Sequence, residues 1–263
     1  MLKNTSMHVA YVIIWHILLL RGRKMDNQQP RPDEGKVQML CLNARLGDGY
    51  FWKHPECVNY KLIYTSTTPE LLYLKMGIAP HMFKSGVREI DLSRAKGRFP
   101  NAKQMYRLAS VVSPTITKFK HLEIYDLIDL LTLDDLALWY LDDGSTIARH
   151  DNPQYEYTRT YLCIGNSFPD EQSREYFLKK MSSLFGEKSA GTIRANGSTA
   201  SERNKVWSVP VTIAKSILNA ASEYDILKHK FPSWVRFRDH SHGEVGLKGT
   251  MQPEAPESLN AAT

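Results

Sequence analysis

The chain has 263 residues, of which 42% are hydrophobic and 24% charged, and this composition is typical of a globular protein with a buried core. Its formal net charge of +6 favours a polyanionic partner only weakly, because many basic proteins bind no nucleic acid. The three cysteines form no CxxC pair, which argues against a disulfide framework and a structural zinc site and indicates a reducing, intracellular compartment.

The N-terminal 34 residues are predicted to be an extension or a linker that precedes the core. The apolar run His8–Leu20 is shorter than the ~20 residues that a membrane span requires, so we expect no stable membrane association. This run is similar to the apolar part of a signal peptide, but it is followed by RGRK and not by small residues of a cleavage site. An interfacial segment or a start of translation at Met25 therefore fits the pattern at least as well as export.

Two stretches predict helices that end in Asp-Gly. The first, KVQMLCLNARLGDGYF, is expected to end at residues 47–49, with Gly49 placed as a left-handed C-terminal cap. The second, TLDDLALWYLDDGST, is expected to begin at a capping box of Thr132 and Asp135 and to end at residues 142–144. A carboxylate at a helix C-terminus costs about 0.3–1 kcal/mol unless a cation neutralises it. The two helix ends therefore predict either solvated aspartates or a cation site.

The segments after the two helices have the same order of elements. NYKLIYTSTTPELLYLKMG and YTRTYLCIGNSFPDEQSREYFLKKMSSLFG both predict a strand, a cap with Pro69 or Pro169 near the first turn, and a helix whose apolar stripe belongs to the core. KQMYRLASVVSPTITKF and KVWSVPVTIAKSIL both predict a strand that leads into another helix. The duplication places Asp48 and Asp143 at equivalent positions, 95 residues apart.

The duplicated pattern predicts an α+β protein with antiparallel sheets, each packed against helices on one face. In YKLIY and YTRTYL, polar and aromatic residues alternate with apolar ones, as a sheet with one solvated face requires. The predicted division of the chain is an extension at 1–34, one repeat at 35–130, a second repeat at 131–238 and a disordered tail at 239–263.

This pattern resembles the LAGLIDADG homing endonucleases over roughly residues 37–235. Leu136–Gly144, LALWYLDDG, is a clear copy of the nine-residue motif, similar to the branch that reads LALWYLDDGS, and Cys41–Gly49, CLNARLGDG, is a weaker copy. The resemblance implies two pseudo-symmetric αββαββα repeats that form a saddle of antiparallel sheets over DNA, with the motif helices packed together. Asn43 and Arg45 stand where the motif usually has small or apolar residues, and the bulky Leu138 and the charged Asp142 stand at positions that are often small.

The resemblance also implies a shared catalytic site. Asp48 and Asp143 would meet near the pseudo-twofold axis and hold Mg²⁺, with Mn²⁺ as the alternative, which would relieve their repulsion and the helix-end penalty. Gly47 and Asp142 are the further candidate positions at this metal site, with Asp142 expected to be solvated or to neighbour the ligands. Lys103 and Lys205 are the candidates for orienting solvent and stabilising charge in the transition state, although solvated lysines at strand ends are the ordinary alternative.

The implied partner is double-stranded DNA with a long asymmetric target, cut on both strands by a monomer in the setting of an intron or other mobile element. The alternative is a LAGLIDADG protein that binds nucleic acid without cutting it, as an intron RNA maturase or a DNA-binding regulator. The compartment would be a bacterial or phage-infected cytoplasm or an organelle. The candidates for the DNA-facing side of the sheets are Lys53, Lys61, Arg88, Arg149, Arg159 and Arg194.

Overall fold

The computed structural model describes residues 33–91, 104–149, 157–164, 167–168, 170–195, 205–232 and 235. His8–Leu20, Lys103, Pro169 and the predicted tail 239–263 lie outside the described residues. Within the described ranges, no helix is both long enough and apolar enough to cross a membrane.

The described elements form two units with the same order of helices and strands. The first unit contains α2 (Asp33–Leu46), β1 (Gly49–Trp52), β2 (Lys61–Ser66), α3 (Pro69–Ile78), the 3-10 turn η1 (Pro80–Met82), β3 (Arg88–Glu89), β4 (Tyr106–Ala109), α4 (Pro114–Lys120) and α5 (Ile124–Asp129). The second unit contains α6 (Leu133–Asp143), β5 (Gly144–Arg149), β6 (Tyr157–Cys163), α7 (Glu171–Phe185), β7 (Thr192–Ala195), β8 (Lys205–Val209), α8 (Val211–Ser222) and the 3-10 turn η4 (Lys228–Lys230). Apart from α5 and the two 3-10 turns, both units follow the predicted order of elements.

Each unit builds one four-stranded sheet. The strand order is β1-β2-β4-β3 in the first sheet and β5-β6-β8-β7 in the second. All neighbouring strands in both sheets are antiparallel. The prediction of an α+β protein with duplicated antiparallel sheets is therefore confirmed.

Local sequence signals explain where several helices begin. The Thr132 backbone N–H and hydroxyl both donate to Asp135 Oδ2, at 2.8 and 2.6 Å, so the predicted capping box is formed. Asp170 Oδ1 accepts from the Ser173 backbone N–H at 2.7 Å and caps α7. Pro69 occupies the first turn of α3, where its missing N–H leaves no hydrogen bond unmade.

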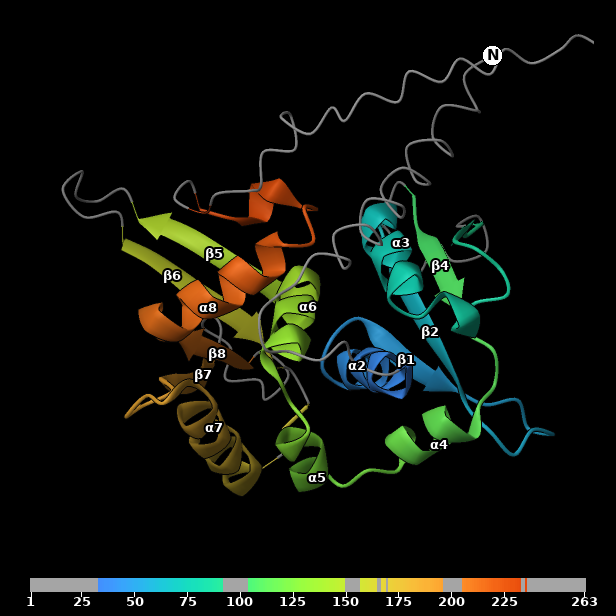
Figure 1. The fold of residues 1–263 in the computed structure, drawn as a ribbon, viewed down its shortest axis with the longest axis horizontal. Helices are drawn as coiled ribbons and strands as arrows, with labels where there is room; N and C mark the ends of the chain where they lie inside the picture. The colour runs from blue at the N-terminus through green and yellow to red at the C-terminus, as the bar shows by residue number, and fades with distance from the viewer. Residues whose placement is uncertain are drawn as a thin grey trace, which may run out of the picture.

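The motif helices α2 and α6 lie at the centre of the molecule. They contact each other directly, and Figure 1 shows them between the two sheets. Helix α8 packs on α6, α4 packs on α2, and α5 packs on α7. Most of α6 is buried, and its Trp139 packs against Phe168 and Phe177 of the second unit. This arrangement brings the C-terminal ends of both motif helices into one region of the molecule.

The predicted alternation of buried and exposed residues holds for one inner strand and fails for the other. In β6, Thr160 and Leu162 are buried, whereas Tyr161 between them is half-buried. In β2, Leu62, Ile63 and Tyr64 are all buried, so the prediction of alternation in YKLIY is wrong at this point. Because successive strand residues face opposite sides, three buried residues in a row mean that both faces of β2 are covered there.

Gly49 is not a left-handed helix cap, so that prediction is wrong. It begins β1, pairs with Tyr64 of β2, and is not one of the described glycines with positive φ, which are Gly186 and Gly191. A Cβ atom at residue 49 would lie 2.6 Å from Tyr64 Cε1 and 2.7 Å from the Ala44 Cα. Glycine is therefore required here by the close approach of the strand to α2 and not by an unusual backbone conformation.

Candidate active site

The site is built at the C-terminal ends of α2 and α6, where three aspartates meet. Asp48 follows α2 and is exposed, whereas Asp142 and Asp143 are the last two residues of α6 and are buried and half-buried. Their charges interact, because Asp142 raises the pKa of Asp48, and both Asp48 and Asp142 raise the pKa of Asp143. The fold thus concentrates negative charge at two helix ends that already carry partial negative charge.

The protonation of Asp143 responds most clearly to this environment. Burial of the carboxylate is the largest cause, followed by repulsion from Asp48 and Asp142, and together they raise the pKa of Asp143 to about 7 against the opposing effect of Lys75 and Lys230. The pKa of Asp48 is also raised: although the residue as a whole is exposed, partial desolvation of its carboxyl group by the surrounding protein is the largest cause and repulsion from Asp142 the second. Near neutral pH, the Asp143 carboxyl therefore carries a proton in part of the molecules unless further positive charge is bound.

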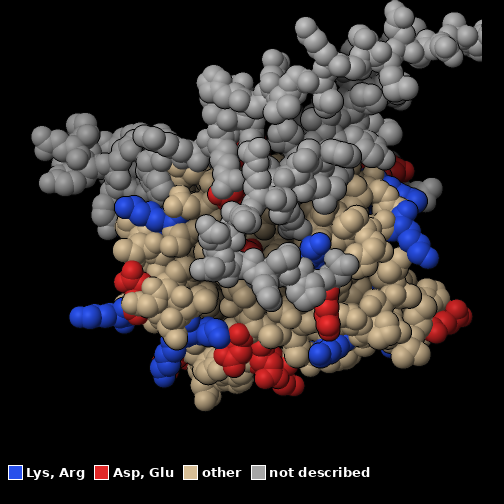
Figure 2. All heavy atoms as spheres, viewed as in Figure 1, with Lys and Arg blue, Asp and Glu red and all other residues tan. Residues whose placement is uncertain are grey.

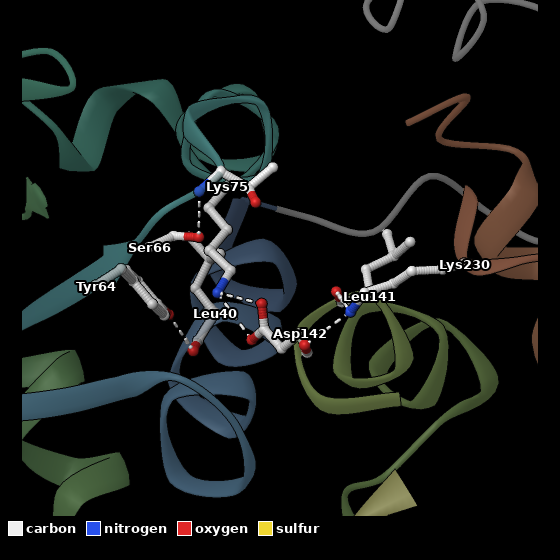
Figure 3. A network of polar contacts seen from close by, with 8 residues as sticks. Leu40, Tyr64, Ser66, Lys75, Leu141, Asp142 and Lys230 are labelled. Atoms are coloured by element: carbon white, nitrogen blue, oxygen red, sulfur yellow. Dashed lines mark hydrogen bonds and ion pairs between the residues drawn. The ribbon is translucent and has the colours of Figure 1, made fainter. Parts of the chain in front are cut away.

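Asp142 is held by a buried lysine. Lys75 Nζ lies 2.8 Å from both carboxylate oxygens of Asp142, and the two side chains are 1% and 0% exposed (Figure 3). The same ammonium lies 4.2 Å from the centre of the Tyr64 ring, where it makes a cation–π contact. Asp142 is therefore not solvated, and its negative charge is compensated within the protein.

A second lysine caps the end of α6. Lys230 Nζ donates hydrogen bonds to the carbonyl oxygens of Leu141 and Asp142, at 2.6 and 2.9 Å (Figure 3). The Tyr140 hydroxyl in turn donates to the Lys230 carbonyl at 2.6 Å, which ties η4 to the helix. Carbonyls at a helix C-terminus lack partners within the helix, and a cation there also opposes the helix dipole. Burial lowers the pKa of Lys230, while the three aspartates raise it.

Gly47 allows the two helix ends to approach. A Cβ atom at residue 47 would lie 2.7 Å from Asp142 Oδ2 and 3.2 Å from Asp142 Cβ. The bulky aspartate at a usually small motif position is thus accommodated because glycine faces it. Of the other departures, Asn43 and Leu138 are buried, and neither amide atom of Asn43 has a hydrogen-bond partner among the described residues. Arg45 donates to the carbonyl oxygens of Lys120, the last residue of α4, and Leu122, at 2.9 and 3.3 Å.

The donor set fits a hard divalent cation. The described residues contain no group of three or more His, Cys, Asp or Glu side chains that would hold a metal ion unaided. Mg²⁺ is, however, commonly bound by one or two carboxylates together with substrate phosphates and water. Asp48 and Asp143 supply two such carboxylates, and burial first and neighbouring carboxylates second raise the pKa of each. Gly47 has only a backbone carbonyl to contribute.

The lysines that act on these carboxylates differ from those singled out in the sequence. Lys205 is the first residue of β8, half-buried and opposite Ala195, and Lys103 lies outside the described residues. Lys75 and Lys230 lower the pKa of both Asp48 and Asp143. Lys75 could have been found, because it follows the buried Leu71 by four residues and so lies on the apolar face of α3, where a charge requires a partner.

The outer face of the first sheet carries aromatic and basic side chains. The register places Trp52 beside Lys61, whose Nζ lies 4.4 Å from the centre of a Trp52 ring. On the same face, Arg88 of β3 pairs directly with Arg107 of β4, and both are exposed. Like charges directly opposite each other destabilise a sheet. Arg107 therefore joins Arg88 as a candidate for the DNA-facing side of this sheet, and it is one that the sequence did not single out.

The other candidate DNA-facing residues are distributed over both sheets. Arg194 Nη2 donates to the Tyr161 hydroxyl at 2.8 Å, and its guanidinium lies 5.1 Å from the ring centre. Arg159 pairs with the exposed Ile147 on the same outer face. Lys53 follows β1, and Arg149 is the last residue of β5. In the view of Figure 2, basic and acidic groups of the described residues are interspersed.

Comparisons with known proteins identify the fold. No model of a protein family and no curated protein matches the sequence. The structure is similar to that of the homing endonuclease I-WcaI bound to its DNA recognition sequence, with a TM-score of 0.57, 16% identity, and coverage of 75% of this chain and 84% of that chain.

Two further solved structures have lower scores. The N-terminal LAGLIDADG domain of DUF199/WhiA has a TM-score of 0.44 and 12% identity, with coverage of 84% of this chain and 91% of that chain. I-DmoI in complex with DNA and Mn has a TM-score of 0.41 and 13% identity, with coverage of 72% of this chain and 98% of that chain. The similarity to I-WcaI, together with the paired motif helices and the duplicated sheets, establishes that this chain has the LAGLIDADG homing endonuclease fold.

Proposed function

We propose that this protein is a metal-dependent, site-specific endonuclease that hydrolyses both strands of double-stranded DNA. The observation that carries the proposal is the convergence of Asp48 and Asp143 at the ends of two packed helices, where burial and, after it, neighbouring carboxylates raise the pKa of each. A protein that only binds phosphates gains nothing from unneutralised carboxylates at that place. An enzyme that must hold a divalent cation against a phosphate requires them.

In this proposal, each repeat contributes one metal-binding catalytic carboxylate, Asp48 or Asp143. When bound, Mg²⁺ or Mn²⁺ would activate the attacking water and neutralise charge that develops on the phosphate. Asp142 supports Asp143 without serving as a main ligand, because Lys75 already neutralises it. Lys103 and Lys205 remain the proposed residues for orienting solvent, and we add Lys230, at the end of α6, to these candidates.

The proposed partner is a long, asymmetric DNA target bound along the outer faces of the two sheets. These faces differ, since the first has the Arg88–Arg107 pair and the second has Arg194 in contact with Tyr161. Different side chains on equivalent faces would contact different half-sites. Because both motifs belong to one chain, we propose a monomer, encoded in an intron or other mobile element and acting in a reducing intracellular compartment.

The test is cleavage of the DNA that flanks the insert carrying this gene, with the two flanks joined. We expect double-strand breaks in Mg²⁺ and none in EDTA. Replacing Asp48 or Asp143 by Asn should slow cleavage on the order of 100-fold or more, or leave only nicking, because a group that stabilises developing charge is lost. The control is Asp126→Asn, at an exposed position on α5.

The second candidate function is nucleic-acid binding without cleavage, as a maturase acting on intron RNA or as a DNA-binding regulator. It is favoured by Lys75 and Lys230, which already compensate part of the charge at the helix ends. In that case, wild-type protein would bind the joined flanks or the intron RNA tightly and leave the DNA intact in Mg²⁺ and in Mn²⁺. That result would overturn the endonuclease proposal.

A further inference from the structure

The buried ion pair between Lys75 and Asp142 joins the two repeats. Lys75 belongs to α3 of the first unit, and Asp142 belongs to the motif helix of the second. The ammonium reaches both carboxylate oxygens at 2.8 Å in a place that is almost fully shielded from water. Leaving either charge buried alone would be strongly unfavourable, so the two groups hold each other in place.

Within the described part of the chain, the pair has no counterpart at the equivalent positions. Gly47 precedes Asp48 as Asp142 precedes Asp143. Because glycine has no side chain, no ion pair of this kind can form at residue 47. The duplicated fold is therefore asymmetric at its centre.

This asymmetry fixes the end of one motif helix more firmly than that of the other. The carboxylate of Asp142 is held by Lys75, and its carbonyl accepts a hydrogen bond from Lys230 at 2.9 Å. Asp143 is the next residue, so its backbone is held immediately on its N-terminal side. Asp48 instead follows Gly47, which has no side chain that could be anchored, and Asp48 is itself an exposed residue.

We propose that Lys75 and Asp142 form a positioning pair that holds Asp143 in its catalytic position, so that loss of the pair slows cleavage of one DNA strand selectively. This inference rests on the proposed endonuclease function and assigns the pair to one of its two half-sites. Neither residue is assigned contact with the reacting atoms. The pair instead restricts the orientations that Asp143 adopts, so that its carboxylate stays close to the productive one.

The experiment measures the two strands separately. Each strand of the joined-flank DNA carries a different 5′ label, and single-turnover rates are measured in Mg²⁺ for wild type, K75M and the double variant K75M/D142N. The double variant is included because K75M alone leaves Asp142 as a buried, unpaired charge. Asp143→Asn identifies the strand that depends on Asp143. Lys180→Met is the matched control, since Lys180 makes a more exposed ion pair with Asp129 at 3.7 Å.

Dissociation constants for DNA in EDTA and thermal unfolding midpoints are measured for the same proteins, and rates are taken well below each midpoint. We expect K75M and the double variant to slow the Asp143-dependent strand by about 10–100-fold, the range seen when groups that orient metal ligands are lost. The other strand, the affinity in EDTA and the Lys180→Met control should stay close to wild type. Nicked DNA should accumulate.

Four outcomes would overturn the inference. Equal slowing of both strands would show that the pair only maintains the fold. The same conclusion would follow if the double variant, unlike K75M, had wild-type cleavage rates on both strands and a wild-type unfolding midpoint. A change confined to DNA affinity would assign the pair to binding. Absence of cleavage by the wild type would overturn the proposed function itself and, with it, any role of the pair in strand cleavage.

Discussion

At the scale of single residues, Asp143 differs from an ordinary aspartate because it is half-buried beside two other carboxylates. Its pKa of about 7 in the folded protein is well above the ~3.9 of an aspartate in an unfolded chain. Between these values, the folded state keeps a proton that the unfolded state releases. The free energy of unfolding therefore falls as pH rises from about 4 to about 7, and a bound cation would reverse this loss.

The first prediction concerns this pH dependence. In EDTA, wild-type protein should lose on the order of 1–3 kcal/mol of unfolding free energy between pH 5 and pH 8, after allowance for partial solvent screening. The Asp143→Asn variant should lose less unfolding free energy over this pH range, and at pH 8 it should be more stable than the wild type. Denaturant titrations across this pH range measure the effect, with Asp126→Asn as the control. Equal stability of Asp143→Asn and wild type at pH 8 would mean that the charged carboxylate carries no cost.

At this scale, the negative charge at the helix ends can be predicted from the sequence, but the lysines that compensate it cannot. The excess of negative charge at both helix ends was visible, because it depends on residues adjacent in the chain. The compensating cations were not, because Lys75 and Lys230 lie 67 and 88 residues from Asp142. Only the position of Lys75 on an apolar helix face signalled a buried partner. The capping role of Lys230 depends entirely on how the chain returns to α6 after α8.

At the scale of elements, order was predictable and close packing was not. Apolar periodicity and caps recur in both repeats, so the succession of helices and strands could be derived from them. The sequence predicts Gly49 as a left-handed helix cap, whereas glycine is required at residues 49 and 47 because atoms of other elements lie too close for a Cβ atom. Such contacts depend on the separation of packed elements, which no local pattern encodes.

The second prediction tests this packing with two glycine substitutions. Gly47→Ala places a methyl group 2.7 Å from Asp142 Oδ2, so it should destabilise the protein by about 1–3 kcal/mol through overpacking. Gly77→Ala, within α3, meets no atom within 4 Å and should stabilise by about 0.5–1 kcal/mol through helix propensity. Chemical denaturation compares the two. Effects of the same sign would show that the motif helices have room to separate at Gly47.

At the scale of the whole molecule, two copies of one unit have diverged around a shared centre. The sheets keep the same strand order, whereas the buried ion pair and the residues on the outer faces differ between the units. The helix interface is therefore specific to this pair of repeats. A chain with two copies of the first repeat would have two Gly47 residues at its centre. A chain with two copies of the second repeat would have two Asp142 residues there and no Lys75 to pair with them.

The third prediction concerns the outer face of the first sheet, where Arg88 and Arg107 oppose each other at exposed positions. If both guanidinium groups bind DNA phosphates, R88A/R107A should reduce the slope of log K against log salt by about 0.9 for each phosphate that is no longer neutralised. Titrations with duplex DNA in EDTA at several salt concentrations measure the slope without cleavage. The matched control is K179A/K188A, which removes two exposed lysines in and just after α7. An equal reduction of slope in both double variants would mean that DNA is bound by overall charge and not by the outer face of the sheet.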